Sequence, residues 1–283
     1  MAELIDGKLV SAKIREKIAY DVAEFKKEFN KTPGLAVIIV GENPASLVYV
    51  RNKHKACVEA GMNSIEVKLP EETSEEELLS KINELNNDSS VHGILVQLPL
   101  PKHIDETRVL NSILPCKDVD AFHPVNVGKI MIGNYNLLPC TPAGVMDLLD
   151  YYNVELSGKR AVVIGRSNIV GKPMALLLLE RNATVTVCHS RTKDISEYTK
   201  CADVIVVAVG KPCFLKGDMV KQGAVVVDVG INRLDNGKLC GDADFESLQN
   251  IASLITPVPG GVGPMTITTL LKNTLSAAKE QVK

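Results

Sequence analysis

Apolar residues at helical spacing alternate with short continuous apolar runs along the first half of the chain. The first helix, expected over residues 14–29, is predicted by apolar residues at three- and four-residue steps: Ile14, Ile18, Val22, Phe25 and Phe29. Pro33 and Gly34 end it, and the next apolar run predicts a buried strand over residues 35–40. Further helices are expected over 44–60 and 73–86, and further strands over 65–69 and 93–98.

Two short polar patterns mark where helices begin. Asn43 followed by Pro44 is typical of an N-cap with proline at the first helical position. Ser74 and Glu77 have the spacing of a capping box, in which each residue satisfies a backbone N–H of the other. Both patterns support helices that begin after a strand, as in an α/β fold.

Nearly continuous Val and Ile runs dominate the second half. They predict strands near 160–165, 184–188, 204–209 and 225–229, and such runs are typical of parallel strands covered on both faces. Residues 115–142 carry four prolines and few periodic apolar positions, so the domain connection is expected there. Thr141 and Pro142 are expected to open a helix that runs to about Tyr152.

A stretch rich in glycine and proline, residues 256–266, precedes a final helix expected from about Thr266. This stretch holds too many glycines and prolines for a regular element. It is either a surface loop or a segment whose backbone approaches a ligand closely, and its length and density favour the second interpretation.

Length, charge and cysteine usage narrow the class of protein. A chain of 283 residues favours two domains. A formal net charge of −2 argues against a non-specific nucleic-acid binder. We expect no membrane span, because no apolar run is long enough, and no signal peptide. The seven cysteines lack C-x-x-C spacing and the five histidines lack metal-ligand spacing, so we expect free thiols, a cytoplasmic location and no metal.

The most informative segment is a glycine-punctuated turn between a predicted strand and a predicted helix. It reads Gly165-Arg166-Ser167-Asn168-Ile169-Val170-Gly171-Lys172-Pro173. Such a turn lets backbone N–H groups approach a phosphate at a helix N-terminus, where the partial positive charge favours an anion. Arg166 stands where the common G-x-G-x-x-G pattern has its second glycine, so a turn without a ligand is the alternative. A nucleotide-cofactor site is the leading hypothesis.

The residues after the next predicted strand indicate which cofactor. An NAD site usually carries Asp or Glu about twenty residues after the turn, where it binds the ribose hydroxyls. This chain has His189-Ser190-Arg191-Thr192 instead. A cation and two hydroxyls suit a 2′-phosphate, which an acid would repel. The sequence therefore predicts NADP, with Arg191 as one candidate ligand of the phosphate.

Three polar side chains share one face of the helix expected over 44–60. Ser46, Tyr49 and Lys53 lie at i, i+3 and i+7, and Ala56 and Ala60 continue the stripe. Burying a lysine ammonium costs several kcal/mol unless it is paired or loses its proton. A lysine without its proton can act as a general base. The alternative is a solvated lysine, because other charged residues flank it.

Polar residues at strand ends add further candidates. Gln97 stands at the end of the strand expected over 93–98, where α/β folds place ligand sites, or else it bonds a nearby backbone group. Asp118 and Asp120 follow in a loop. A carboxylate there can accept two parallel hydrogen bonds from an amino-heterocycle such as a pterin, although loop acids also commonly cap turns.

Taken together, these segments resemble the bifunctional methylenetetrahydrofolate dehydrogenase/cyclohydrolase family over essentially the whole chain. The matching segments, in order, are Ser46 to Ala56, Gly93 to Pro101, Lys117 to Asp120, Pro139 to Pro142, Gly165 to Pro173 and Pro257 to Thr266. The first of them looks like the family's Tyr-x-x-x-Lys helix. One departure is Ala121, where many relatives carry Gly after the aspartate, and it concerns only local loop geometry.

The resemblance implies a role for each candidate residue. Lys53 would be the key catalytic residue with support from Tyr49 and Gln97, and Asp120 would anchor the pterin end of the folate. The substrate-binding set is completed by Pro259 and Gly260. The cofactor-binding set comprises Gly165, Arg166, Ser167, Ile169, Ser190, Arg191 and Ile231. The implied reactions are NADP-dependent oxidation of 5,10-methylenetetrahydrofolate to the methenyl form and hydrolysis of that product to 10-formyltetrahydrofolate.

We therefore expect an α/β fold with two α/β domains and a cleft between them. Residues 1–140 would form an N-terminal folate-binding catalytic domain, and residues 141–265 a Rossmann-type domain with a doubly wound parallel sheet. Residues 266–283 would form a helix that packs back on the N-terminal domain. The resemblance further implies tetrahydrofolate derivatives as partners, a homodimer and a place in one-carbon metabolism and purine biosynthesis.

Three competing interpretations stay open at this point. The protein could be a dehydrogenase without the hydrolase step, an NADP oxidoreductase for another small substrate, or a non-catalytic NADP-sensing module. Lys53 and Gln97 argue against the first and Asp120 against the second. The sensing module would not need Tyr49, Lys53 and Gln97 to converge, so their arrangement in the structure separates it from an enzyme.

Overall fold

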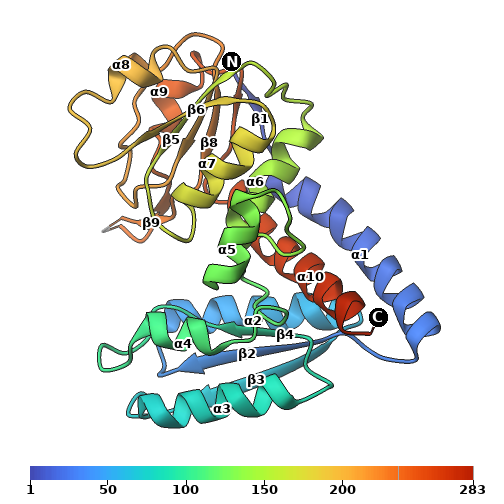
Figure 1. Ribbon diagram of the computed structural model, residues 1–283. Coiled ribbons are helices and arrows are strands. Elements are labelled where there is room, and N and C mark those ends of the chain that lie inside the picture. The colour runs from blue at the N-terminus through green and yellow to red at the C-terminus, as the bar shows by residue number, and fades with distance from the viewer. Residues whose placement is uncertain (235, 283) are drawn as a thin grey trace. The chain divides into compact units, whose positions relative to one another are not determined.

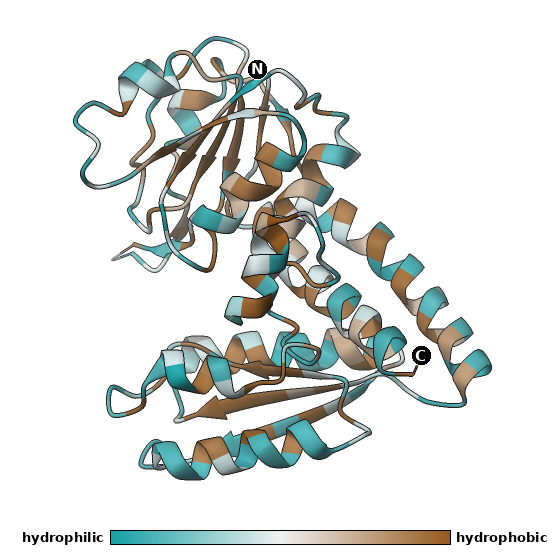
Figure 2. Ribbon diagram, viewed as in Figure 1, coloured by the Kyte–Doolittle hydropathy of each residue, from teal (hydrophilic) through white to brown (hydrophobic). Residues whose placement is uncertain are grey.

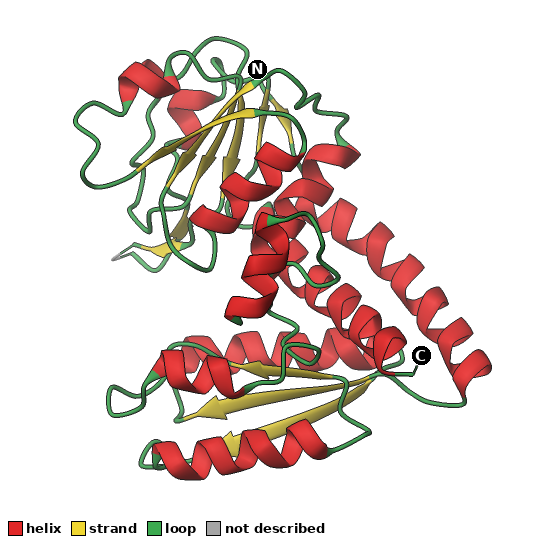
Figure 3. Cartoon of the chain, in the orientation of Figure 1, coloured by secondary structure: helices red, strands yellow, loops and turns green. Residues whose placement is uncertain are grey.

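The computed structural model describes residues 1–234 and 236–282, and the chain divides into two compact units (Figure 1). The six-stranded unit comprises Met1–Ala12 and Thr141–Thr266. The three-stranded unit comprises Lys13–Cys140 and the chain from Ile267 onward. Both units combine a parallel sheet with helices, which confirms the predicted α/β class with two α/β domains (Figure 3).

The six-stranded unit is built on one parallel sheet in the order β1-β11-β8-β7-β5-β6. Its strands are β1 (Glu3–Leu4), β5 (Arg160–Ile164), β6 (Thr184–Cys188), β7 (Val204–Val207), β8 (Val225–Asp228) and β11 (Leu254–Ile255). The strands β7 and β8 are buried at every residue, as expected for parallel strands covered on both faces. All four strands predicted for the second half of the chain are therefore confirmed.

The other elements of this unit are short. Its helices are α6 (Cys140–Tyr151), α7 (Gly171–Glu180), α8 (Ser196–Thr199) and α9 (Phe245–Leu248), with a 3-10 turn at Gly217–Met219. A two-stranded antiparallel ribbon pairs β9 (Asn232–Arg233) with β10 (Leu239–Cys240). The strands β1 and β11, the ribbon and the shortest helices were not expected, because elements of two to four residues carry no readable periodicity.

The three-stranded unit has a parallel sheet in the order β3-β2-β4. Its elements are β2 (Gly34–Val40), α2 (Pro44–Glu59), β3 (Asn63–Leu69), α3 (Glu75–Asn87), β4 (Gly93–Val96), α4 (Glu106–Ser112) and α5 (Pro124–Met131). The expected strand over 93–98 thus ends at Val96, and Gln97 stands just beyond it. The segment 115–142, where the domain connection was expected, contains α5, and the two units divide within it, after Cys140.

The central strand β2 shows why its sequence is a continuous apolar run. Alternate residues pack on opposite faces: Leu35, Val37 and Ile39 join one buried cluster, while Ala36, Ile38 and Val40 join another. The first cluster also holds residues of α2, such as Val50, and the second holds residues of α3, such as Ile82. Helices on both faces leave no polar side for the strand, and Figure 2 shows it as apolar throughout.

Two long helices begin earlier than their apolar periodicity indicated. Helix α1 covers Gly7–Phe29 rather than 14–29, because the Asp6 carboxylate accepts hydrogen bonds from Lys8 N (2.9 Å) and Leu9 N (3.0 Å) and so caps it. Helix α10 covers Val262–Gln281 rather than starting at Thr266. Its first turn contains Gly263 and Pro264, and proline is tolerated there because the first N–H groups have no partner within the helix.

The units differ from the expected domain division at the N-terminus. Residues 1–12 belong to the six-stranded unit and not to the expected domain of residues 1–140. The reason is long-range pairing: Glu3 lies opposite Leu254 in the sheet, and the Asp6 amide donates to the Tyr152 hydroxyl over 2.8 Å. Neither contact leaves a signal in the local sequence.

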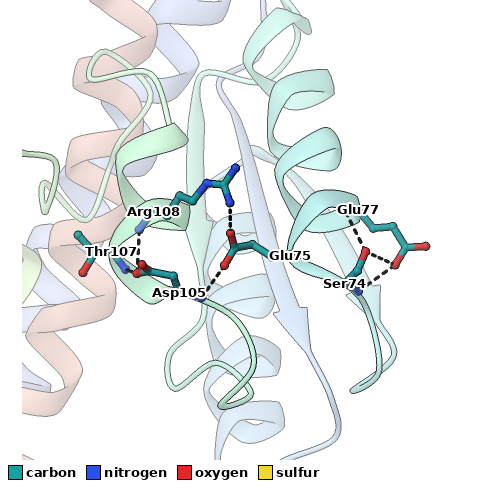
Figure 4. A network of polar contacts seen from close by, with 6 residues as sticks. All are labelled: Ser74, Glu75, Glu77, Asp105, Thr107 and Arg108. Carbon is teal, nitrogen blue, oxygen red and sulfur yellow. Dashed lines mark hydrogen bonds and ion pairs between the residues drawn. The ribbon is translucent and has the colours of Figure 1, made fainter.

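The predicted capping box at the start of α3 is confirmed (Figure 4). The Ser74 amide donates to Glu77 Oε2 (2.9 Å) and the Glu77 amide donates to Ser74 Oγ (3.3 Å). The Glu77 carboxylate accepts hydrogen bonds from the amide and the hydroxyl of Ser74. Both bonds lower the pKa of Glu77, and the bond from the amide has the larger effect. Next to the box, Glu75 pairs with Arg108 and accepts from the Asp105 amide, which links α3 to α4 (Figure 4).

Replacing Ser74 by alanine should lower the free energy of unfolding by about 1 kcal/mol, because an N-terminal amide of α3 loses its acceptor. Urea denaturation followed by circular dichroism measures this change. The matched control is Ser80→Ala, a site in the middle of the same helix that takes no part in its cap. An equal loss in both variants would contradict the capping role.

Candidate functional site

The turn after β5 is built around two glycines that no other residue can replace without a shift of the backbone. Gly165 has φ +125°, and a Cβ there would lie 2.2 Å from the Ala208 carbonyl oxygen. A Cβ on Gly171 would lie 2.3 Å from the Gly165 carbonyl oxygen. The glycines therefore serve close packing of the turn against β7 and against the start of α7, as in a dinucleotide-binding turn.

Polar groups of the same turn organise the N-terminus of α7. Ser167 Oγ accepts from Val170 N (3.1 Å) and Gly171 N (3.3 Å). Arg166, Ser167 and Ile169 are exposed at the turn, ahead of the helix. The predicted strand, turn and helix are thus present. Ser167 accepts from the first N–H groups of α7, from Gly171 N through its Oγ and from Lys172 N (3.0 Å) through its carbonyl.

A pocket of about 240 Å³ lies beside this turn. It is lined by residues from the carboxyl ends of three parallel strands: Gly165 and Arg166 after β5, His189 and Ser190 after β6, and Val209 and Lys211 after β7. The lining that the structure describes carries the cations Arg166 and Lys211 and no carboxylate. This lining suits a phosphorylated ligand, because it contains no negative charge that would repel a 2′-phosphate.

The sequence missed Lys211 as a residue of this pocket. A signal was present, because Lys211 follows a predicted strand and the carboxyl ends of parallel strands meet at one edge of a sheet. Arg191, which was expected at the site, lies in a tight turn where its amide donates to His189 Nδ1 (3.2 Å), and its side chain is exposed.

Two buried aspartates organise the same edge of the sheet. The Asp242 carboxylate accepts from the amides of Val209 (2.6 Å), Gly210 (2.8 Å) and Lys211 (2.9 Å), and from Asn232 Nδ2 (2.8 Å). Asp242 is fully buried. One carboxylate therefore holds both the loop that lines the pocket and the residue next to Ile231.

The neighbouring Asp228 is held by three more backbone amides. It accepts from Gly230 (2.9 Å), Asp242 (2.9 Å) and Ala243 (2.8 Å). Burial raises the pKa of Asp228 to about 6, against the opposing effect of these bonds. These contacts tie the residues just before and just after the β9–β10 ribbon to the end of β8.

The glycine-rich segment before α10 is tightly packed, and Pro259 lies within it. Gly260 has φ +109°, and its carbonyl accepts from Lys8 N (3.2 Å). A Cβ on Gly7 would lie 1.7 Å from the Gly261 carbonyl oxygen. Ile231, which is 47% exposed, has its Cδ1 3.7 Å from the position of a Cβ on Gly263. Ile231 and this segment are therefore close within the six-stranded unit.

Helix α2 carries the predicted lysine of the three-stranded unit. Asn43 Oδ1 accepts from Ser46 N (3.2 Å), which confirms the predicted N-cap. Ser46, Ala56 and Ala60 are buried, and Lys53 is only 9% exposed. The alternative interpretation of Lys53 as a solvated lysine is therefore wrong. Tyr49, one turn before Lys53, is 42% exposed.

Lys53 Nζ has a specific partner at the end of β4. Lys53 Nζ donates to Gln97 Oε1 over 2.9 Å, and Gln97 Nε2 donates to the Leu98 carbonyl over 2.8 Å. The two neighbours fix the orientation of the Gln97 amide, because only its oxygen can accept from Lys53 Nζ and only its nitrogen can donate to a carbonyl. The two candidates thus form one pair, which a buried lysine requires.

The two loop aspartates have different surroundings. Asp118 is buried, and its Oδ2 accepts from His123 N (2.8 Å) and Asn126 Nδ2 (2.9 Å), which joins it to the start of α5. Burial raises the pKa of Asp118, and these bonds oppose the rise. Asp120 is half-buried, so its carboxylate is the one open to a ligand.

Ala121, the residue after Asp120, stands where many relatives carry glycine. Ala121 has φ +57°, a left-handed conformation that glycine adopts at little cost and alanine rarely adopts. Glycine would adopt this conformation at a lower conformational cost than Ala121 does.

The buried thiol of Cys140 lies within the electrostatic influence of both Lys53 and Asp120. Cys140 is buried at the start of α6. Burial raises the pKa of this thiol most, and the Asp120 carboxylate raises it further, whereas the charge of Lys53 lowers it. The acid and the lysine therefore both act on the same buried sulfur. Lys53, Gln97 and Asp120 belong to one region of the three-stranded unit.

Two other kinds of site do not occur within residues 1–234 and 236–282. No helix there is long and apolar enough to cross a membrane. The same residues contain no group of three or more His, Cys, Asp or Glu side chains that could hold a metal ion.

Comparison with known proteins extends these local observations to the whole chain. Residues 5–120 match the model of the tetrahydrofolate dehydrogenase/cyclohydrolase catalytic domain, and residues 139–282 match that of the family's NAD(P)-binding domain. The chain is 62% identical to the bifunctional protein FolD of Acetivibrio thermocellus, over 100% of this chain and 99% of that protein.

Solved structures agree with this match. A bifunctional FolD methylenetetrahydrofolate dehydrogenase/cyclohydrolase from Campylobacter jejuni is 56% identical with a TM-score of 0.96, over 99% of both chains. The Trypanosoma brucei enzyme, solved with NADP cofactor and an inhibitor, is 42% identical with a TM-score of 0.96, over 100% of this chain and 99% of that one. This chain belongs to the tetrahydrofolate dehydrogenase/cyclohydrolase family, of which it contains both the catalytic and the NAD(P)-binding domain.

Proposed function

We propose that this protein oxidises 5,10-methylenetetrahydrofolate to 5,10-methenyltetrahydrofolate with NADP and hydrolyses the product to 10-formyltetrahydrofolate. Family membership supports the two reactions. The observation that carries the proposal in this chain is the buried Lys53, whose Nζ donates to Gln97 Oε1 over 2.9 Å. An NADP-sensing module would have no use for such a pair.

The three-stranded unit would bind the folate. Asp120, half-buried next to the buried Asp118, would accept two parallel hydrogen bonds from the amino-heterocycle of the pterin. Tyr49, exposed one turn before Lys53, would support Lys53 at the substrate. The proposed substrate-binding set also includes Pro259 and Gly260, since glycine allows a close approach of the backbone to a ligand.

The pocket beside Gly165 would bind NADP. The lining fits the cofactor because it combines Gly165, in the turn ahead of α7, with Arg166, Ser190 and Lys211, and it has no carboxylate among the described residues. Ser167, Ile169, Arg191 and Ile231 complete the proposed cofactor-binding set. Arg166 and Ser190 would hold the 2′-phosphate that distinguishes NADP from NAD.

The oxidation places few demands on acid–base chemistry. The carbon that loses hydride lies between two nitrogens, whose lone pairs stabilise the cation that forms. When bound, NADP accepts this hydride. The protein must therefore mainly position the folate, which Asp120 and Tyr49 would do.

Hydrolysis needs a base, and Lys53 would supply it. In its neutral form Lys53 takes a proton from a water molecule as the water oxygen bonds to the methenyl carbon. The lysine then returns a proton to N5 as the carbon–N5 bond breaks. The second proton of the water leaves when the carbon–oxygen double bond forms, and the formyl group stays on N10. Gln97 would hold the amine in the orientation that this transfer requires.

Hydride transfer requires the nicotinamide within roughly 3–3.5 Å of the folate carbon. We therefore propose that the cofactor and the folate bind at the same time, with the nicotinamide against the folate carbon. A structure of the ternary complex with NADP and a folate analogue tests this. Binding of the two ligands at separated positions, with Lys53 remote from the nicotinamide, would overturn it.

Three broader features are also proposed. The family resemblance implies a homodimer, which sedimentation equilibrium can measure. The seven cysteines, all free thiols, support a cytoplasmic location, where the reducing environment maintains them. The product would supply formyl groups to purine biosynthesis.

One assay tests the central proposal. Purified protein with methylenetetrahydrofolate and either NADP or NAD should reduce NADP more efficiently, as followed by absorbance of the reduced nicotinamide. With methenyltetrahydrofolate and no nicotinamide, the methenyl absorbance should disappear faster than in buffer. A protein that reduces NADP but leaves the methenyl form at its uncatalysed rate would be a dehydrogenase alone.

Replacing Asp242 by asparagine should raise the KM for NADP about tenfold or more, because the amides of residues 209–211 lose acceptor oxygen and the pocket lining shifts. The cyclohydrolase activity of the same sample should stay within about twofold, since Lys53 and Gln97 lie in the other unit. A parallel fall in both activities would instead indicate general loss of folding.

A further inference from the structure

Asn273 on α10 is a buried amide whose donor capacity is fully used. It is 4% exposed, and its Nδ2 donates to the Val119 carbonyl over 2.8 Å and to the Leu138 carbonyl over 2.7 Å. A primary amide nitrogen carries two hydrogens, so each carbonyl receives one. Both bonds have good lengths for N–H···O contacts.

The two carbonyls belong to segments that border the proposed pterin site. Val119 immediately precedes Asp120, and Leu138 lies two residues before Cys140. The Cys140 thiol also donates to the Val119 carbonyl, over 3.4 Å, and its sulfur lies 3.8 Å from Asn273 Nδ2. One side chain from the C-terminal helix thus joins the backbone before Asp120 to the backbone that leads into α6.

The opposite end of the same loop is also fixed. The Ile94 amide donates to the Lys117 carbonyl over 2.7 Å, which attaches the loop to β4, and the Asp118 carboxylate is held by His123 and Asn126. Asn273 Nδ2 and the Cys140 thiol both restrain the carbonyl of Val119, the last residue before the half-buried Asp120, and the bond from Asn273 is the shorter. The direction in which the Asp120 carboxylate leaves the backbone depends on this peptide.

We propose that Asn273 is a positioning residue that orients Asp120 for two parallel hydrogen bonds to the pterin. The inference rests on the proposed role of Asp120 as the pterin anchor. A bidentate contact tolerates little misorientation, because both oxygens must meet their donors at once. Asn273 touches neither substrate nor cofactor in this account and acts through the Val119 carbonyl.

The test replaces Asn273 by leucine, which has a similar volume and no donor. The KM for methylenetetrahydrofolate should rise about tenfold, equivalent to about 1.4 kcal/mol, and the KM for methenyltetrahydrofolate should rise with it. The KM for NADP should stay within about twofold. A purely structural role would lower the fraction of folded enzyme, and hence kcat, without a selective change in the folate KM.

The matched control is Thr274→Val, at a site that is on the same helix and is also buried. Its Oγ1 donates to the Leu270 carbonyl within α10 over 2.8 Å, so its loss should leave the folate KM unchanged. Should the leucine variant fold poorly, Asn273→Ser keeps one hydroxyl donor and a smaller side chain. It should show a smaller rise in the same folate KM.

A double-variant cycle separates this inference from the proposed function. In an Asp120→Ala background the Asn273→Leu change should raise the folate KM no further, because its effect passes through Asp120. If Asp120→Ala raises the folate KM and Asn273→Leu does not, Asn273 has no positioning role while the proposed anchor stands. If Asp120→Ala leaves the folate KM unchanged, the anchor itself is wrong, and the role of Asn273 falls with it.

Discussion

Replacing Lys53 by methionine should lower kcat for methenyltetrahydrofolate hydrolysis by a factor of about 10²–10⁴, the range that positioned general acid–base groups contribute. Methionine keeps most of the apolar stem and removes the amine that donates to Gln97 Oε1 over 2.9 Å. The rate of loss of the methenyl absorbance measures the effect. NADP binding, measured by fluorescence titration, should be nearly unchanged.

The chain provides a matched control for this experiment on the same helix. Lys55 is exposed and its Nζ lies 3.8 Å from Glu59 Oε1, an i,i+4 surface pair. Such pairs contribute little to stability, so Lys55→Met should retain cyclohydrolase activity. Full activity of the Lys53 variant, or equal losses in the two variants, would show that Lys53 is not the base.

Replacing Arg166 by alanine should lower kcat/KM for NADP by a factor of about 10–100, because hydrogen bonds to charged groups contribute about 1.5–3 kcal/mol. Arg166 lines the pocket together with Ser190 and Lys211. NAD lacks the 2′-phosphate, so kcat/KM for NAD should change far less. The preference for NADP over NAD should therefore narrow.

A second cation close to the turn serves as the control. Lys172 lies in the first turn of α7, and its Nζ donates to Asn168 Oδ1 over 2.7 Å, outside the described pocket lining. Lys172→Ala should keep the NADP preference. The assignment of the cofactor pocket would be wrong if the wild-type enzyme used NAD as efficiently as NADP, or if Arg166→Ala lowered both efficiencies equally.

The surroundings of Lys53 show how much the spacing of residues along a helix can predict. The spacing of Ser46, Lys53 and Ala56 placed these residues together correctly, and all three are buried. The same spacing also allowed a solvated lysine. The amide that pairs with Lys53 belongs to Gln97, 44 residues later in the chain. No local sequence pattern specifies a contact between residues so far apart.

Some residues of the pocket beside Gly165 were predictable from the local sequence, and others were not. Gly165 and Gly171 were predictable because a strand, a tight turn and a helix follow one another in sequence, and the turn needs residues without a Cβ. The roles of Lys211 and Asp242 depend on β7 lying next to β5 in the sheet and on Asp242 reaching three amides about 31 to 33 residues away.

By itself the sequence determined what depends on neighbouring residues: the buried strands, the helix N-caps at Asn43 and Ser74, and the glycine turn. These features follow from steric limits and from hydrogen bonds that reach only a few residues. Only the tertiary structure decided which polar side chains meet. The pairing of Lys53 with Gln97 and the bonds from Asn273 to Val119 and Leu138 join distant segments, since burial leaves each polar group no stable alternative to the partner that packing brings to it.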